Sequence, residues 1–315
     1  MPCPRVVITG ASGLLGAHVA AALSRSYEVI GVDRHAWWGD EPVKMLVGDL
    51  EDPHFLQRAV ASMAPDVLIH CAALAHVDQC EQDPAQAYAS NATLTHRLVG
   101  AVSSRCLVVY ISSDGVFRGN KPWATEQDLP CPRTVYGRSK VHGEWSVAQA
   151  TDNHLIVRTN FYGWSSGRKT TFGEWLSHAL EIEEPVTLFT DFYFTPIYVV
   201  DLVERVARLL ETDYRGIIHV GGRDRLSKYE FGRLMADAGH FRMDHIRPGS
   251  IDEVPVMARR PKDMSLSSQR FVQSTGLEVP AGMSGLRRFI ADRGRSLSAR
   301  LTASETPMAS SPSVE

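Results

Sequence analysis

Tyr136 and Lys140 stand four residues apart in a segment that predicts a helix, residues 136–147. At this spacing two side chains share one face of a helix, so a phenol and an ammonium group lie side by side. A phenol with its ordinary pKa of about 10 is a poor acid–base group at neutral pH. A neighbouring ammonium stabilises the phenolate, so we expect Lys140 to lower the pKa of Tyr136 toward the range in which proton transfer is efficient.

A serine hydroxyl precedes this helix. Ser113 follows the apolar run 106–111, which predicts a buried strand, and is itself followed by Asp114. A hydroxyl directed at a carbonyl oxygen stabilises the negative charge that develops there during reaction. Ser113, Tyr136 and Lys140 therefore predict proton transfer to or from a substrate oxygen. The alternative is an ordinary amphipathic helix, with Tyr136 packed and Lys140 solvated.

A glycine-rich turn near the N-terminus predicts a binding site for phosphate groups. The β-branched run 6–8 stops at Gly10, and an alanine- and leucine-rich segment predicts a helix over 14–23. Gly10 permits the turn, Gly13 lets phosphates approach the backbone, and Gly16 lets the helix lie close to the strand. The unpaired N–H groups and the positive dipole at the helix start favour an anion.

An acidic residue, Asp33, ends the next predicted strand, residues 27–33, where an acid that binds ribose hydroxyls belongs. The glycine turn and Asp33 together predict a dinucleotide cofactor, NADH or NADPH. Asp33 favours NADH, whereas the adjacent Arg34 can reach a 2′-phosphate, so the choice between them stays open. A strand–helix–strand unit with an empty crevice is the alternative.

The remaining strands repeat the same arrangement. Alternating strands and helices predict an α/β fold with a doubly wound parallel sheet of the Rossmann type, and ligands bind beyond the carboxyl ends of its strands. Asp49 follows a short strand, where it either bonds an adenine amino group or caps the helix that begins near Pro53. Four segments with ligand-binding character directly follow predicted strands: 10–16, 33–34, 71–75 and 112–114.

The chain divides into three parts by pattern. Residues 1–163 predict the NAD(P)-binding domain, including one long helix over 78–100. Clean alternation lapses from residue 164, so 164–292 predict a smaller, interleaved substrate-binding domain in which the strand 216–220 returns to the sheet. The segment 293–315 is rich in Ser, Ala and Pro without an apolar period, and we expect it to be disordered.

Composition excludes several classes of function. A net charge of −3 over 315 residues gives no basic field, so we expect no nucleic-acid partner. No apolar run approaches a membrane span, and the first strand begins too early for a signal peptide, so we expect a cytoplasmic protein without a membrane partner.

The five cysteines lack Cys-x-x-Cys spacing and predict free thiols. His70 and His76 find no third ligand at metal spacing, so no metal is expected. A homodimer is left open.

Taken together, the glycine turn, Ser113, Tyr136 and Lys140 resemble the extended short-chain dehydrogenase/reductase family. Five stretches resemble, more closely, its dTDP-4-dehydrorhamnose reductases: Cys71 to Glu81, Ser112 to Phe117, Tyr136 to Glu144, Arg158 to Gly163 and Arg260 to Asp263. The similarity runs from about residue 5 to 290. It implies hydride transfer from NADH or NADPH to the 4-keto carbon of a 6-deoxy nucleotide sugar.

The resemblance also implies roles for residues. Tyr136 would donate the proton, Lys140 would assist it and bind the cofactor, and Ser113 would polarise the carbonyl. Ser113, Asp114 and Phe161 would face the sugar, while Arg260 is a candidate for its diphosphate, as is Arg259. The residues that we assign to the cofactor are Gly10, Ser12, Gly13, Leu14, Leu15, Gly16, Asp33, Arg34, Asp49, Leu50, Ala73, Leu74, Ala75, Tyr136 and Lys140.

The chain departs from the reductase pattern at three positions. Ser113 stands where Thr is usual, Gly115 where Tyr is usual, and Phe161 where Trp is common. The hydroxyl and the second aromatic ring survive, so the chemistry is retained while the particular sugar is left open. Two alternatives remain. One is an epimerase or dehydratase on the same scaffold, and the other is a cofactor-binding regulatory protein like the β subunit of methionine adenosyltransferase.

Overall fold

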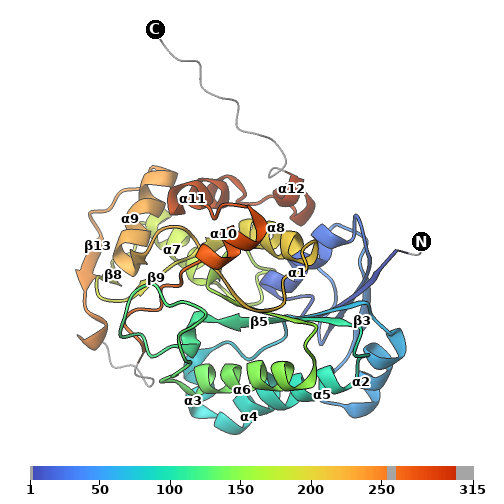
Figure 1. Ribbon diagram of the computed structural model, residues 1–315. Helices are drawn as coiled ribbons and strands as arrows, with labels where there is room; N and C mark the ends of the chain where they lie inside the picture. Colours follow the sequence, from blue (N-terminus) through green and yellow to red (C-terminus); the bar gives the residue numbers. More distant parts are fainter. Residues whose placement is uncertain (1–2, 254–259, 303–315) are drawn as a thin grey trace.

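A central sheet of seven parallel strands organises the protein. The computed structural model describes residues 3–253 and 260–302 of the 315-residue chain (Figure 1). The strand order is β11-β6-β5-β4-β1-β2-β3, so the α/β fold with a doubly wound parallel sheet is confirmed. These strands are β1 (Arg5–Thr9), β2 (Glu28–Asp33), β3 (Lys44–Val47), β4 (Val67–His70), β5 (Leu107–Ser113), β6 (His154–Thr159) and β11 (Gly216–Val220).

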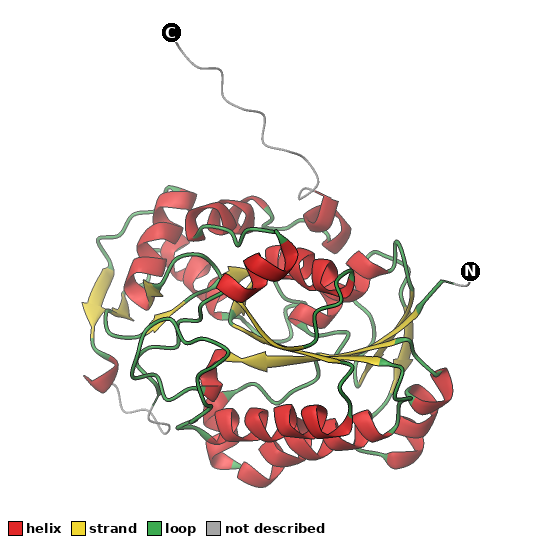
Figure 2. Cartoon of the chain, in the orientation of Figure 1, coloured by secondary structure: helices red, strands yellow, loops and turns green. Residues whose placement is uncertain are grey.

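Alternation along the strands divides the apolar side chains between two helical layers. Val6 and Ile8 of β1 belong to one core cluster, whereas Val7 between them belongs to a second. The first layer contains α1 (Leu14–Leu23) and α8 (Val199–Leu210), and the second contains α2 (Pro53–Ala59), α5 (Leu94–Gly100) and α6 (Val135–Ala150). Figure 2 shows the strands between these two layers. Both faces are covered, as a parallel sheet requires.

The predicted helix over 78–100 is wrong in its continuity. The segment forms α3 (Val77–Gln82), α4 (Pro84–Tyr88), a π-helical turn (Ala89–Thr93) and α5. Pro84 explains the break, because a proline disfavours helical backbone in the residue before it. Asp83 accordingly has φ −131° and ψ 81°, and its carboxylate caps α4 by accepting a hydrogen bond from the Gln86 N–H.

The predicted disorder from residue 293 is wrong for residues 297–302, which form α12 (Leu297–Thr302). Leu297 and Leu301, one helical turn apart, are buried in the first core cluster. Asp40 accepts a hydrogen bond from the Ser298 N–H and so fixes the start of this helix. Burial of these two leucines stabilises the helix, although the Ser-rich composition of the segment predicts disorder. Residues 303–315 lie outside the described part of the chain.

A smaller region covers the carboxyl ends of β5, β6 and β11. β11 pairs with β6, which confirms that residues 216–220 return to the sheet. Ring contacts among Tyr162, Phe231 and Phe289 join the helices of this region. Its helices are α7 (Phe172–Glu181), α9 (Lys228–Gly239), α10 (Gln269–Thr275) and α11 (Gly282–Ala291). Its strand pairs are β7 (Phe161–Tyr162) with β10 (Ile197–Tyr198), β9 (Tyr193–Phe194) with β12 (Leu226–Ser227), and β8 (Val186–Phe189) with β13 (Ile246–Gly249).

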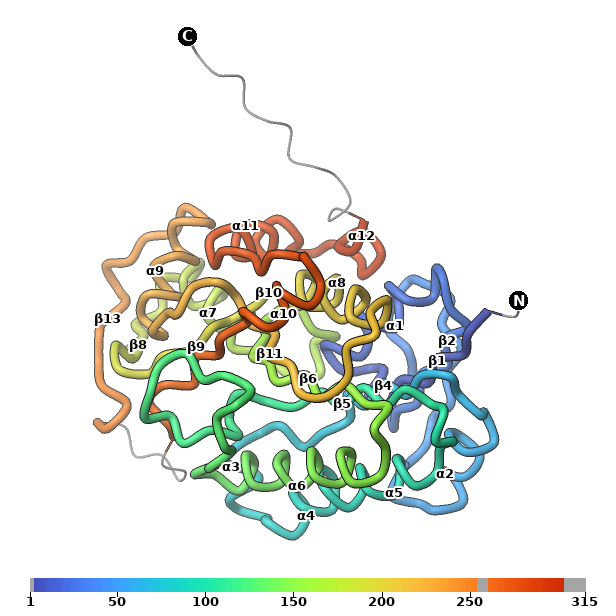
Figure 3. The backbone as a smooth tube through the Cα atoms, in the orientation of Figure 1, coloured from blue at the N-terminus to red at the C-terminus, as the bar shows by residue number. Residues whose placement is uncertain are grey.

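Two segments distant in sequence meet beside this region. The loop 117–133 runs alongside residues 262–268 (Figure 3), and the Asp263 and Ser267 N–H groups donate to carbonyls of Gly119 and Ala124. All five cysteines are free thiols. No helix within residues 3–253 and 260–302 has the length and apolar character needed to cross a membrane.

Candidate active site

The segments expected to bind ligands lie at one edge of the sheet. In the parallel register His70, at the end of β4, pairs with Thr9 of β1 and with Tyr110 of β5. Ser113 continues β5 and pairs with Thr159 of β6. Because parallel strands end on the same side, the turn 10–16 and the segments after β2, β4 and β5 share this edge.

The glycine turn fits a pyrophosphate. Gly10 has φ +70°, and a Cβ at that position would lie 2.6 Å from the Ala72 nitrogen. A Cβ on Gly16 would lie 2.1 Å from the Gly10 oxygen, so α1 packs directly on the turn. Gly13 precedes α1 without any side-chain cap, and the first turn of this helix holds no acidic residue. Uncapped N–H groups at a helix start, without a competing carboxylate in that turn, suit a bound anion.

The acid of the predicted ribose site is tied to this turn. The Asp33 carboxylate accepts hydrogen bonds from the Ser12 N–H at 3.1 Å and from the His35 N–H at 3.0 Å. Arg34 is exposed at the same edge. The indole N–H of Trp38 donates to the Ser12 carbonyl at 2.9 Å, so this ring braces the turn. These hydrogen bonds hold the turn in place. They do not decide between NADH and NADPH.

Asp49 and Leu50 occupy different environments. Asp49 is exposed, and its carboxylate accepts a hydrogen bond from the Glu51 N–H at 2.9 Å. The cap of α2 is Asp52, whose side chain accepts from the His54 N–H, so the interpretation of Asp49 as that cap is wrong. Leu50 is buried in the second core cluster, where its side chain packs among apolar residues.

The segment Ala73–Leu74–Ala75 is held in place by a residue whose role the motifs did not reveal. The Leu74 N–H donates to Asn91 Oδ1 at 2.8 Å, and Asn91 Nδ2 donates to the Leu74 carbonyl at 3.0 Å. Asn91 Nδ2 also donates to Ser139 Oγ at 2.9 Å. Asn91 is 1% exposed, so one buried amide joins the loop after β4 to α6.

Ser113, Asp114 and Tyr136 come together beyond β5. Ser113 Oγ donates to Asp114 Oδ1 at 3.0 Å, and Asn160 Nδ2 donates to Asp114 Oδ2 at 2.6 Å. Burial raises the pKa of Asp114 to about 6, against these hydrogen bonds. Burial also raises the pKa of Tyr136 to about 12, while a hydrogen bond with Ser113 lowers it. The prediction of a lowered pKa for Tyr136 is therefore wrong in direction.

The position of Lys140 explains why it does not lower the pKa of Tyr136. Its Nζ donates to the Ile111 carbonyl at 2.8 Å and lies 4.0 Å from the centre of the Tyr110 ring. Burial lowers the pKa of Lys140 to about 7, and its charge acts on Cys71 and His70 at the end of β4. The ammonium thus lies at the segment after β4, and the phenol of Tyr136 remains protonated at neutral pH.

A buried ion pair, Glu144 with Arg158, lies one helical turn beyond Lys140. Glu144, one turn further along α6, accepts hydrogen bonds from Arg158 Nη2 at 2.7 Å, Arg158 Nε at 2.9 Å and Ser112 Oγ at 2.5 Å. The side chains of Glu144 and Arg158 are 3% and 1% exposed, so water screens them little. The negative charge of Glu144 raises the pKa of Lys140, against the effect of burial.

Phe161 and Arg260, the two residues expected at the sugar and at its diphosphate, have different partners. Phe161 is partly buried in β7 and packs on the first core cluster. Arg260 Nη2 donates to Asp78 Oδ2 at 3.0 Å, which links residue 260 to α3. Arg259, the second candidate for the diphosphate, lies outside the described residues.

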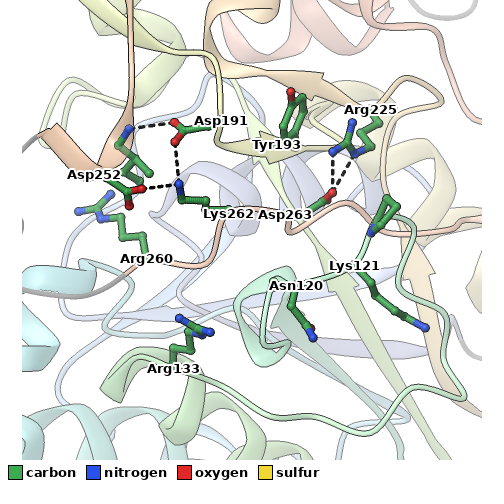
Figure 4. A pocket seen from close by; sticks show the side chains of 13 residues that line it. Asn120, Lys121, Arg133, Asp191, Tyr193, Arg225, Asp252, Arg260, Lys262 and Asp263 are labelled. Carbon is green, nitrogen blue, oxygen red and sulfur yellow. Dashed lines mark hydrogen bonds and ion pairs between the residues drawn. The ribbon is translucent and has the colours of Figure 1, made fainter.

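A polar cavity of about 960 Å³ borders Arg260 (Figure 4). Two ion pairs line this cavity: Lys262 with Asp191 at 2.9 Å, and Arg225 with Asp263 at 2.7 Å. Arg133 reaches it from the loop 117–133, and it makes no side-chain ion pair within the described part of the chain. Other side chains around the cavity are those of Asn120, Lys121, Tyr193, Ile251 and Asp252. The lining holds five cations and three carboxylates, an excess of positive charge that suits an anionic ligand, although ion pairs with carboxylates already engage every one of these cations except Arg133 within the described residues.

Comparison with known proteins gives the family. The model of the RmlD substrate binding domain matches residues 4–294. The chain belongs to the RmlD family. The β subunit of methionine adenosyltransferase 2 from Rattus norvegicus is 30% identical over 292 residues, covering 86% of this chain and 82% of that relative. A dTDP-4-dehydrorhamnose reductase from Mycobacterium tuberculosis is 30% identical over 277 residues, covering 85% of this chain and 86% of that relative.

A solved RmlD-like structure extends the similarity to the whole fold. The dTDP-4-dehydrorhamnose reductase of Bacillus anthracis, in complex with NADP, superposes with a TM-score of 0.83 at 28% identity. The match covers 92% of this chain and all of that one. Within residues 3–253 and 260–302, no group of three or more His, Cys, Asp or Glu side chains is suited to a metal ion.

The position of Lys140 leads to a pH dependence that this RmlD family member should show. An unfolded lysine keeps its proton up to a pKa of about 10.5, whereas the folded pKa is about 7. Between these values the unfolded chain binds more protons, so Lys140 makes the free energy of unfolding rise with pH. We expect this contribution to be about 2 kcal/mol between pH 7 and 9.

Urea denaturation of the cofactor-free protein at these two pH values measures the rise, and Lys140→Met isolates it. The Met variant should lose about 2 kcal/mol of the pH-dependent gain relative to the parent protein. Exposed Lys44 provides the matched control, since Lys44→Met should leave the rise unchanged. Equal slopes for the parent protein and Lys140→Met would contradict the assignment.

Proposed function

We propose that this protein reduces the 4-keto group of a nucleotide-activated 6-deoxy sugar with NADH or NADPH. The observation that carries the proposal is the convergence of Ser113, Asp114 and Tyr136 at the sheet edge that also holds the glycine turn. The ammonium of Lys140 lies at the same edge, where it bonds the Ile111 carbonyl and acts on Cys71 after β4. The family and its reductase members support the same reaction class.

The raised pKa of Tyr136 suits reduction. When bound at the glycine turn, a reduced nicotinamide would supply the hydride that reduces the carbonyl carbon. The oxygen then becomes an alkoxide, a far stronger base than a phenolate, so the phenol of Tyr136 can give up its proton despite a pKa of about 12. The Ser113 hydroxyl, turned from Asp114 toward the substrate, donates a hydrogen bond to the same oxygen and stabilises its developing charge. The proton lost by Tyr136 is regained from solvent between turnovers.

The cofactor and the substrate are assigned to different parts of this edge. The residues of the glycine turn, with Asp33 and the segment 73–75, hold the cofactor, and Lys140 bonds its nicotinamide ribose. Asp114 and Phe161 face the sugar. Arg260 and Arg133 supply positive charge for the diphosphate in the polar cavity.

A cofactor-oxidation assay tests the proposal. Purified protein is mixed with NADH or NADPH and with a panel of 4-keto-6-deoxy nucleotide sugars that differ in base and stereochemistry, and loss of the reduced cofactor is followed by its absorbance. Turnover with at least one sugar is the expected result. Cofactor binding without turnover of any sugar would contradict the reductase.

A regulatory role is the second candidate, because one relative at 30% identity is a β subunit of methionine adenosyltransferase. That role predicts cofactor binding without turnover, together with association with a partner protein. An epimerase or dehydratase has less support. A dehydratase needs an acidic pair beside the polarising hydroxyl, and Gly115 follows Asp114 where a second acid would stand.

A further inference from the structure

Lys228 lies in a cage of phenylalanine rings on the substrate side of the sheet edge. It is the first residue of α9, directly after the Ser227 cap. Its Nζ lies 3.4 Å from the ring centre of Phe194, 4.1 Å from that of Phe172 and 5.2 Å from that of Phe192. Phe172 comes from α7, and Phe192 and Phe194 come from the continuous segment that ends in β9, so two segments of the smaller region surround one ammonium group. Figure 1 shows α7 and β9 near α9.

This placement is unfavourable for the fold alone. Among the described residues, none accepts a hydrogen bond from Lys228 Nζ, although the ammonium has three N–H donors. Ring faces attract a cation but accept no ordinary hydrogen bond, and Lys228 is half-buried, so its Nζ stays open to water or to a ligand. The positive end of the α9 dipole adds to the cost, because a cation in the first turn of a helix is repelled. Burial accordingly lowers the pKa of Lys228 to about 7.

Two charged groups act on this ammonium, and they locate it relative to the site. The Asp114 carboxylate attracts it, and the Arg260 guanidinium repels it. Asp114 accepts a hydrogen bond from Ser113, the residue assigned to the reacting carbonyl, and Arg260 borders the polar cavity. Lys228 therefore lies within electrostatic reach of Asp114 and Arg260, the residues assigned to the sugar and to its diphosphate.

We propose that Lys228 is a specificity-determining residue that donates a hydrogen bond to the sugar hydroxyl next to the keto carbon, while Asp114 accepts one from the same hydroxyl. This inference rests on the proposed function. Asp114 directly follows Ser113 in the chain, so a group that it binds lies within a bond or two of the polarised carbonyl. A hydroxyl both donates and accepts, and thus satisfies a carboxylate and an ammonium together. The substrate class is then a keto sugar that keeps the adjacent hydroxyl.

The direct test removes the charge from the protein and the hydroxyl from the sugar. Lys228→Met retains an unbranched side chain in the ring cage, and kcat/KM is measured with the accepted 4-keto-6-deoxy sugar nucleotide and with its 3-deoxy counterpart. We expect kcat/KM to fall roughly 30-fold for the sugar with the hydroxyl and less than threefold for the 3-deoxy sugar, since a charge-assisted hydrogen bond is lost only in the first case. Equal losses for both sugars would overturn the proposal.

Lys169→Met is the matched control, because Lys169 is exposed on the loop before α7, and both values should stay unchanged. Urea unfolding separates a structural role from a binding role. Removing this half-buried charge, which no described residue pairs by a hydrogen bond or ion pair, should leave the unfolding midpoint of Lys228→Met equal to or above that of the parent protein. A lowered midpoint together with equal losses of kcat/KM would mean that Lys228 serves the fold.

A binding measurement distinguishes failure of this inference from failure of the proposed reaction. Titration calorimetry compares a nucleotide sugar, dTDP-glucose, with dTDP alone. If the protein binds the sugar nucleotide but reduces no sugar, the reductase proposal fails, and Lys228 is still tested by affinity. A Kd raised about 10-fold or more by Lys228→Met for dTDP-glucose, with an unchanged Kd for dTDP, supports contact with the sugar. An equal rise for both ligands, or no binding of dTDP-glucose by the parent protein, would overturn it.

Discussion

Tyr136→Phe is expected to lower kcat for sugar reduction by about 10³-fold while leaving the affinity for reduced cofactor within about twofold. The phenol is the group that delivers a proton to the oxygen left by hydride transfer, and phenylalanine has no proton to give. The ring itself stays in place, because Tyr136 packs in an apolar cluster with Cys80, Ala87 and Val135. The loss therefore reports on the hydroxyl alone.

Tyr88→Phe is the matched control for this substitution. Tyr88 packs on the same apolar cluster as Tyr136, and its ring contacts His142 rather than Ser113. Its kcat should stay within about twofold of the parent value, since no proton-transfer step uses it. The readouts are steady-state oxidation of reduced cofactor and cofactor fluorescence titration. Turnover by Tyr136→Phe at more than a tenth of the parent rate would remove Tyr136 from the proton-donor role.

The backbone of the candidate site follows from patterns that are local in sequence. A β-branched run before Gly10, with small residues after it, predicts a strand, a tight turn and a helix packed on both. Because parallel strands end at one edge, Asp33 and Ser113 then had to lie near this turn. The return of residues 216–220 to the sheet was predictable for the same reason, since a buried apolar strand needs a paired neighbour.

The protonation of the site was not predictable in this way. Spacing indicates that Tyr136 and Lys140 share a helix face, but it carries no information on how deeply each group is buried. Burial dominates here, so the pKa of Tyr136 rises to about 12 and that of Lys140 falls to about 7. The ammonium is drawn to the Ile111 carbonyl, a partner in β5 that spacing along α6 cannot reveal.

Partners distant in sequence were missed for a related reason. Asn91 and Leu74 are 17 residues apart, and Asn160 and Asp114 are 46 apart. An asparagine within a helical segment, or after a strand, is common enough to have no meaning until its partner is known. Lys228 did carry a signal, because a cation at the start of a helix is unusual. The break at Pro84 also carried one, since a proline there argues against a continuous helix.

Arg158→Met is expected to lower the free energy of unfolding by about 3–5 kcal/mol, because it leaves the buried Glu144 carboxylate without its cation. Arg158 donates two hydrogen bonds to that carboxylate, at 2.7 and 2.9 Å, and both side chains are almost fully inaccessible to water. Ser112 alone remains as a donor from this set. Removing both charges should cost much less, so the double variant Arg158→Met/Glu144→Leu is expected to regain most of the lost stability.

Urea denaturation of the two variants measures this difference, and an exposed ion pair provides the comparison. Arg208 and Glu211 form a pair at 2.8 Å on the surface of α8, with side chains 47% and 59% exposed. Arg208→Met should cost less than about 1 kcal/mol, since water already screens that pair. If Arg158→Met lowers the free energy of unfolding no more than Arg208→Met does, burial does not make the Glu144–Arg158 ion pair more important for stability than an exposed pair. If it costs the expected amount, Glu144 and Arg158 also determine the charge beside Lys140. Arg158→Met should then lose more activity than the fraction of folded protein explains.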